Sequence, residues 1–267
     1  MLISFKLPFN FDPEPLRRDL ELIAPSEWVP HFNTGYYDGD WSGVALRSVG
    51  GAQSQLYPDP SARFADTPVL AECLNIQKAL AAFDCPLESV RLLKLGAGST
   101  IREHTDLNLS FEDGTMRVHI PLTTNEKVDF YVNNEKLMMN PGEAWYINFN
   151  LPHRVNNKGQ TDRIHLVLDC VVNEWLNAVI PPEARKQYDA QPMVVEQSEE
   201  TKASLERFRQ IVLDDASLLD RLRQTWNRRA FITLAVQLGR ERGCDFTAAD
   251  VEDALREARR VWLERWI

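Results

Sequence analysis

Four of the five histidines lie close together in the middle of the chain: His104, His119, His153 and His165. The first opens the triplet His104-Thr105-Asp106. Side chains alternate between the two faces of an extended strand, so His104 and Asp106 project from the same side and can share one cation. His153, in the segment Leu151-Pro152-His153, is the best candidate for a third ligand. The triplet and the distant histidine together predict a metal site.

The number of protein ligands decides what such a site does. Two histidines and one carboxylate on one side of the ion leave its other positions open, which is the arrangement of non-heme Fe(II) oxygenases. Four protein ligands would instead indicate a closed, structural zinc site. We therefore predict that His104, Asp106 and His153 are the metal ligands and catalytic residues of an open iron site.

Two six-residue segments, 117–122 and 163–168, are near copies of each other, with the sequences Arg-Val-His-Ile-Pro-Leu and Arg-Ile-His-Leu-Val-Leu. Each predicts a strand with Arg and His on one face and branched aliphatic residues on the other. Guanidinium groups bind carboxylates through two parallel hydrogen bonds. A cavity between these strands would therefore suit a dicarboxylate. The alternative is that the arginines are charged strand ends and that His119 and His165 are hydrogen-bonded core residues.

The region from Val90 to about Val172 contains short predicted strands separated by turns, for example at residues 140–143. This rhythm is typical of an all-β barrel or sandwich. We predict a mainly β fold, a double-stranded β-helix of the jelly-roll or cupin-like type, with flanking helices. The first 90 residues predict short strands and loops, with one helix near residues 67–83 where Asp66-Thr67-Pro68 provides a cap followed by proline.

Three domains or segments are expected along the chain. Residues 1–180 form the β domain, and residues 181–200, with Pro181-Pro182 and an acid-rich run, form a linker. Residues 201–267 form a small helical domain, because apolar residues recur at helical spacing and Thr247-Ala248-Ala249-Asp250 resembles a capping box. This tail resembles the Nif11-like helical domain; a lid or a homodimer element is the equally weighted alternative.

Composition limits the class of protein. The 267 residues carry a net charge of −9, which disfavours nucleic-acid binding because phosphates need a basic face. No apolar run of membrane-spanning length and no signal-peptide pattern is expected. The four cysteines are scattered without a Cys-x-x-Cys pair, which favours free thiols in a reducing cytoplasm.

The ordered set of motifs resembles the aspartyl/asparaginyl β-hydroxylase family, and within it the bacterial proline cis-4-hydroxylase type. The resemblance covers about residues 35–175 and rests on these segments: Arg91-Leu92-Leu93-Lys94-Leu95, His104-Thr105-Asp106, Arg117-Val118-His119, Gly142-Glu143-Ala144-Trp145-Tyr146, Leu151-Pro152-His153 and Arg163-Ile164-His165-Leu166-Val167-Leu168-Asp169. It implies Fe(II), with 2-oxoglutarate and O₂ as co-substrates. Arg163 would bind the distal carboxylate of 2-oxoglutarate, and Arg117, His119 and His165 would line its pocket.

The resemblance implies hydroxylation of an unactivated C–H bond of an amino acid, with succinate and CO₂ as products. Arg47 and Arg91 are candidates for binding the substrate carboxylate, or are strand-end charges, and Asn148 is expected to face the pocket. Leu107-Asn108-Leu109 replaces a tyrosine-containing segment of the proline enzymes, which puts free proline in doubt. A free amino acid and a residue within a peptide remain alternative substrates. A cupin-like metal-binding protein without oxygenase activity is the alternative function.

Overall fold

The computed structural model describes residues 2–56, 63–106, 109–111, 114–182, 184, 199–223, 228–248, 250–251 and 254–255. The chain divides into two compact units, Met1–Ala190 and Gln191–Ile267, and each is described by itself. None of the helices within these described ranges has the length and apolar character needed to cross a membrane. All four cysteines are free thiols, as predicted.

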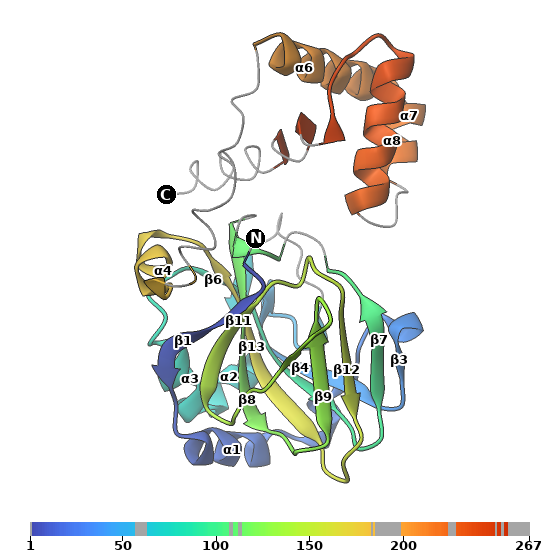
Figure 1. Ribbon diagram of the computed structural model, residues 1–267. Helices are drawn as coiled ribbons and strands as arrows, with labels where there is room; N and C mark the ends of the chain where they lie inside the picture. Colours follow the sequence, from blue (N-terminus) through green and yellow to red (C-terminus); the bar gives the residue numbers. More distant parts are fainter. Residues whose placement is uncertain are drawn as a thin grey trace. The chain divides into compact units, whose positions relative to one another are not determined.

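Two antiparallel sheets build the first unit (Figure 1). The larger sheet contains β1 (Ser4–Asn10), β2 (Val29–Pro30), β4 (Trp41–Val49), β5 (Phe64–Asp66), β6 (Leu87–Leu95), β8 (Thr115–Thr123), β11 (Glu143–Ile147) and β13 (Arg163–Val171). The smaller sheet contains β3 (Tyr37–Asp38), β7 (Thr100–His104), β9 (Val128–Val132), β10 (Glu135–Leu137) and β12 (His153–Asn157). Their strand orders are β1-β11-β8-β13-β6-β4-β2 and β10-β9-β12-β7-β3.

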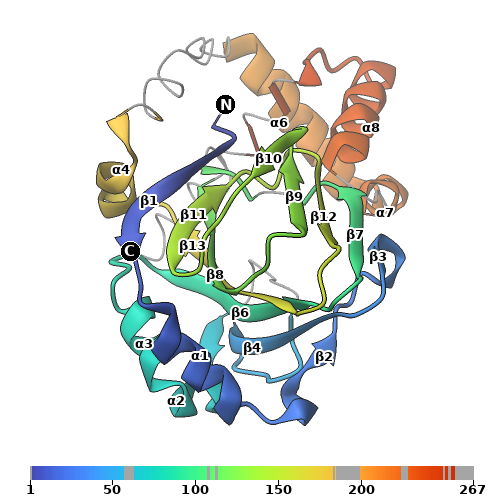
Figure 2. The same cartoon turned by 60° about the horizontal axis from the view of Figure 1, so that its bottom comes forward.

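The chain between β6 and β13 passes back and forth between these sheets. Strands β6, β8, β11 and β13 belong to the larger sheet, and β7, β9, β10 and β12 belong to the smaller one. Figure 2 shows the two sheets facing each other around a common interior. This connectivity confirms the predicted double-stranded β-helix. Strand β1 extends the larger sheet at one edge, and β4 and β2 extend it at the other.

The alternating pattern of β8 and β13 separates two apolar clusters. Val118, Ile120, Leu166 and Leu168 pack on the outer face of the larger sheet, in one cluster with residues of the flanking helices. Those helices are α1 (Pro13–Leu22), α2 (Pro68–Glu72), α3 (Leu74–Leu80) and α4 (Glu174–Val179). A second cluster fills the space between the sheets and includes Ile101, Phe130 and Phe149. The polar residues of β8 and β13 therefore face the interior.

The helices of the first unit differ from the prediction. The single helix expected near residues 67–83 is broken at Cys73, whose backbone is not helical. The buried carboxylate of Asp19, on α1, accepts hydrogen bonds from the backbone N–H groups of Asn75 and Ile76, both at 2.8 Å. It thereby caps the start of α3, which local sequence does not reveal. Helix α1 itself was not predicted.

The second unit contains α6 (Glu199–Asp214), α7 (Ala216–Arg223) and α8 (Arg228–Glu241). Phe208, Val212, Leu218 and Leu238 belong to its apolar cluster. The predicted capping box forms, because Thr247 and Asp250 exchange hydrogen bonds between side chain and backbone. Trp226 and most of the predicted linker lie outside the described residues. The boundaries at residues 180 and 200 and the Nif11-like assignment therefore stay proposals.

Candidate metal centre

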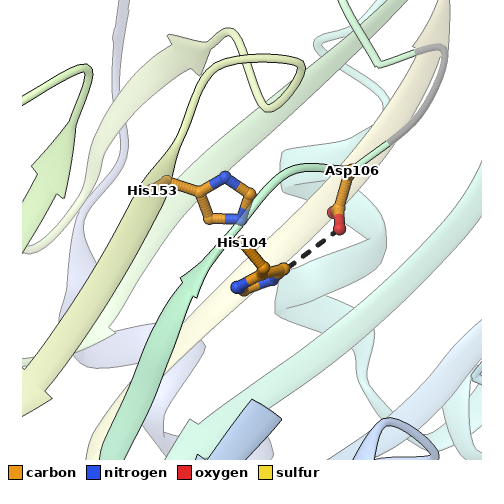
Figure 3. Close-up of side chains that lie close together, drawn as sticks. All are labelled: His104, Asp106 and His153. Carbon is orange, nitrogen blue, oxygen red and sulfur yellow. Dashed lines mark ion pairs between the residues drawn. The ribbon is translucent and has the colours of Figure 1, made fainter. Parts of the chain in front are cut away.

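The smaller sheet brings the three predicted ligands together (Figure 3). His104 is the last residue of β7 and His153 the first of β12, and the two are direct partners in the antiparallel pair. Asp106 follows two residues after His104, and its backbone N–H donates to the carbonyl oxygen of Phe149 at 2.8 Å. One ligand atom of each of the three side chains lies within 4.8 Å of the others. This spacing suits a single metal ion.

Backbone carbonyls set the tautomers of both imidazoles. The Nδ1 atom of His104 lies 2.8 Å from the carbonyl oxygen of Arg102, and that of His153 lies 3.0 Å from the carbonyl oxygen of Leu151. A carbonyl only accepts, so Nδ1 carries the hydrogen and Nε2 keeps its lone pair for a metal. Burial lowers the pKa of His153 to about 4, and its ring is neutral at neutral pH.

The carboxylate of Asp106 is held by one of its two oxygens. Its Oδ2 atom accepts a hydrogen bond from Arg117 Nη1 at 2.7 Å, while Oδ1 lies 3.7 Å from His104 Nε2. Burial raises the pKa of this group, but Arg117 and the two histidines outweigh burial and hold the pKa below its usual value. Asp106 is therefore ionised, with Oδ1 directed toward the other two ligands.

Arg163 is a buried cation without a carboxylate partner among the described residues. Its side chain is almost fully buried, and its guanidinium carbon lies 5.5 Å from the centre of the Phe130 ring. One terminal nitrogen contacts His165 Nδ1 at 2.9 Å, and no described residue is hydrogen-bonded to Nε. Burial lowers its pKa to about 9. Because an unpaired buried charge is unfavourable, this position fits an anionic ligand.

His119 and His165 stand beside Arg163 in the interior. Their Nδ1 atoms lie 3.2 Å apart, and His119 Nε2 is buried without a partner. The His119 ring stacks on Phe149, with ring centres 5.0 Å apart. Burial, followed by the charge of Arg163, lowers the pKa of both rings well below the usual value. The two imidazoles are therefore neutral and add no charge to the Arg163 position.

Arg117, the counterpart of Arg163 on β8, has its charge fully matched. Besides Asp106 it binds Asp169, whose Oδ1 accepts from Nε at 2.6 Å and whose Oδ2 accepts from Nη2 at 3.0 Å. Asp169 also accepts a hydrogen bond from Arg91 Nη2 at 3.0 Å. No role for Asp169 was predicted from the sequence. Its place at even spacing after Arg163 and His165 is the signal that puts it on the same face of β13.

The three predicted substrate residues contact other groups of the protein. Arg47 donates to Asp66 and to the carbonyl oxygens of Leu87 and Phe64. Arg91 donates to Leu56 O and Ser89 Oγ as well as to Asp169, so its guanidinium is occupied. The buried amide of Asn148 donates to Leu2 O rather than facing a pocket. Other groups of the protein therefore already engage the polar atoms of all three side chains.

Aromatic residues from the first 41 positions lie beside the predicted ligands, and none of them was predicted as a site residue. Tyr36 stacks on the His104 ring, with ring centres 5.0 Å apart. The fifth histidine, His31, stacks on Trp41 at 3.5 Å between ring centres. Burial, followed by the charge of Arg91, lowers the pKa of His31 to about 3, so its ring is neutral. The signal available in the sequence is the cluster of rings between residues 28 and 41.

Comparison with known proteins gives a family match. The model of the family described as "Aspartyl/Asparaginyl beta-hydroxylase" matches residues 14–172. Among curated proteins, an L-proline cis-4-hydroxylase from Rhizobium meliloti (strain 1021) is 26% identical over 166 residues, which is 60% of this chain and 58% of that protein. The matched region thus spans less than two thirds of that relative.

Solved structures with a related arrangement of strands have low sequence identity. A 2OG-Fe(II) oxygenase family oxidoreductase from Burkholderia pseudomallei has a TM-score of 0.44 and 15% identity, covering 63% of this chain and 85% of its own. A prolyl hydroxylase from Trichoplax adhaerens, solved with a hypoxia inducible factor peptide fragment, has a TM-score of 0.40 and 12% identity, covering 63% and 82%. At these TM-scores neither likeness supports a functional argument.

Proposed function

This chain belongs to the aspartyl/asparaginyl β-hydroxylase family, and we propose that it is an Fe(II)- and 2-oxoglutarate-dependent dioxygenase. Its reaction is the hydroxylation of an unactivated C–H bond of an amino acid, free or within a peptide, with release of succinate and CO₂. One observation carries the proposal. Three metal-binding side chains converge in a β-helix whose interior also holds Arg163, a buried cation without a protein counter-charge among the described residues.

The proposed iron ligands are His104 Nε2, His153 Nε2 and one oxygen of Asp106. Two imidazoles and a carboxylate suit Fe(II) and leave coordination positions for the co-substrates, and the bound iron supplies the oxidative chemistry. The chain keeps both imidazoles in the tautomer that exposes Nε2. It also holds the second oxygen of Asp106 on Arg117. These contacts orient the ligands before any metal arrives.

The proposed site for the distal carboxylate of 2-oxoglutarate is Arg163. Its Nε is a buried N–H donor that has no hydrogen-bond partner among the described residues. A carboxylate bound there would neutralise the buried guanidinium through charge-assisted hydrogen bonds. Phe130 and Phe149, which lie against Arg163 and His119, make the surroundings apolar and so strengthen that interaction.

The proposed substrate region is the aromatic side of the metal centre, formed by Tyr36, Trp41 and His31. We propose these residues in place of Arg47, Arg91 and Asn148, whose polar groups are already engaged. The relative with a proline substrate and this chain share only part of their lengths. An assay with both kinds of substrate therefore distinguishes a free amino acid from a residue within a peptide.

Succinate formation tests the proposal. Purified protein is stripped of metal and assayed with Fe(II), 2-oxoglutarate and a panel of amino acids and short peptides. The proposal expects succinate that depends on both additions, rises with one of the substrates, and accompanies a mass gain of one oxygen on that substrate. Metal binding without any 2-oxoglutarate turnover would instead support the cupin-like alternative.

A further inference from the structure

The buried carboxylate of Asp169 has no part in the chemistry described so far. We propose that Asp169 is a positioning residue that aims Arg117 at Asp106, so that Asp106 binds the metal through one oxygen only. The inference rests on the proposed function, because it concerns how a ligand of the proposed iron site is held. In this role Asp169 affects Asp106 only through its contacts with Arg117.

The geometry of Arg117 supports this role. A guanidinium group is planar, so fixing two of its nitrogens fixes the direction of the third. Asp169 holds Nε and Nη2 through its two oxygens, at 2.6 and 3.0 Å. The remaining Nη1 then reaches Asp106 Oδ2 at 2.7 Å. The two strands also place these residues as direct partners, since Asp169 lies opposite Arg117 in the β13–β8 pair.

Asp169 is itself anchored from the other side. Its Oδ2 also accepts from Arg91 Nη2 at 3.0 Å. Arg91 is held in turn by the carbonyl oxygen of Leu56 at 2.8 Å and by Ser89 Oγ at 3.2 Å through its Nη1 atom. The side chains of Arg91 and Asp169 are at most 5% exposed, so water does not compete strongly for these contacts. Hydrogen bonds thus connect Leu56, in the loop between β4 and β5, to Asp106, a proposed metal ligand. They pass through Arg91, Asp169 and Arg117.

The charges explain what the loss of Asp169 would do. Arg91 and Arg117 are balanced by the buried Asp169 and the partly exposed Asp106, so the four groups are neutral together. Without Asp169 the only carboxylate of this group is Asp106. The fork of Arg117 would then be free to take both oxygens of Asp106, which is the favoured geometry of an arginine–carboxylate pair. A metal ion would have to displace it.

A double-mutant cycle in metal binding tests the inference without turnover. The affinity of the metal-free protein for Mn²⁺ alone is measured by calorimetry for wild type, Asp169→Asn, Arg117→Gln and the double variant. We expect Asp169→Asn to weaken binding by about tenfold or more, as for other residues that orient metal ligands. In the Arg117→Gln background the same change should alter affinity by no more than about twofold, the usual limit of additivity.

Two further variants keep the test decisive. Asp19→Asn removes a buried carboxylate that only caps α3, and it should leave Mn²⁺ affinity at the wild-type value. If Asp169→Asn does not fold, Asp169→Glu takes its place in the same cycle, because it keeps the charge but displaces the oxygens. An equal loss of affinity with and without Arg117, or no loss at all, would overturn the inference. Absence of Mn²⁺ binding in the wild type would instead reject the proposed metal site itself.

Discussion

The two repeated Arg-x-His segments have nearly the same sequence but opposite electrostatic surroundings. On β8, Arg117 is paired with Asp106 and Asp169. On β13, Arg163 is equally buried but has no carboxylate partner among the described residues and leaves Nε unpaired. The difference separates two kinds of buried arginine. Arg117, whose charge is matched by protein carboxylates, orients a proposed metal ligand. Arg163, which has no such match among the described residues, is the proposed binding position for an anion.

The largest effect is expected from the proposed metal ligands, one of which, Asp106, is bound to Arg117. His104→Ala, Asp106→Ala and His153→Ala should each abolish succinate formation, because each removes one of three protein ligands. Folding should persist, since the apolar clusters do not include these side chains. Metal content by mass spectrometry and the far-ultraviolet circular dichroism spectrum check both parts. Near-normal turnover in any of the three variants would show that the ligand assignment is wrong.

The contrast between the arginines predicts opposite effects on the metal-free, ligand-free protein. Arg117→Met should lower the free energy of unfolding by about 3–5 kcal/mol, because it leaves the buried Asp169 with Arg91 alone and removes the charge partner of the partly exposed Asp106. Arg163→Met should raise the free energy of unfolding, because it removes a buried charge that has no carboxylate partner among the described residues, and the neutral contact with His165 is a smaller loss. Urea denaturation of both variants beside the wild type measures the difference. Equal destabilisation would mean that Arg163 has a counter-charge after all.

A smaller change in the free energy of unfolding is expected when the pH of the same metal-free protein is lowered. Burial lowers the pKa of His31 to about 3 and that of His119 well below its usual value. As the pH falls below about 6.5, the unfolded chain protonates these residues while the folded chain does not. Each such histidine should then lower the free energy of unfolding by about 1.4 kcal/mol per pH unit.

The pH effect is measured by urea denaturation at pH 7 and pH 5. In His119→Gln the loss of stability between these two values should be smaller than in the wild type. An identical loss in wild type and variant would show that His119 is protonated in the folded protein, and therefore that the interior around Arg163 is more polar than the structure indicates.

Removal of the second unit is expected to have the smallest effect on the KM for 2-oxoglutarate. All proposed ligands and Arg163 lie before residue 170, so a chain ending at residue 200 should keep the wild-type KM for 2-oxoglutarate. A peptide-recognition role predicts that this truncation loses hydroxylation of peptides but keeps that of free amino acids. A lid or dimer role, which we favour, predicts uncoupled turnover with both substrates or a changed mass by light scattering. An unchanged mass with intact free amino-acid turnover would contradict that preference.

The features that depend on the alternation of side chains along a strand could be predicted from the sequence. Contacts between residues that lie far apart in the chain could not. The strand pattern of segments 117–122 and 163–168 correctly placed Arg and His on one face, because side-chain direction follows from period two alone. The pairing of Arg117 with Asp169 could not be predicted, since it depends on the register between two strands. The same holds for Asp19, which caps a helix 56 residues away. The contacts of Arg47 with Asp66 and of Asn148 with Leu2 could not be predicted either, because strand position does not reveal which carbonyl or carboxylate a polar side chain meets. Their assignment to substrate binding stays a prediction.

Binding of 2-oxoglutarate to the Mn²⁺-loaded protein tests the central claim most directly. Calorimetry should show binding to the wild type that Arg163→Met weakens by about 2–5 kcal/mol, the usual loss for one partner of a buried charge pair. Each 1.4 kcal/mol corresponds to about a tenfold change in Kd. Arg163→Lys should recover only part of the affinity, because a point charge replaces a planar fork. Wild-type affinity in Arg163→Met would contradict the account, since the anion would then bind elsewhere.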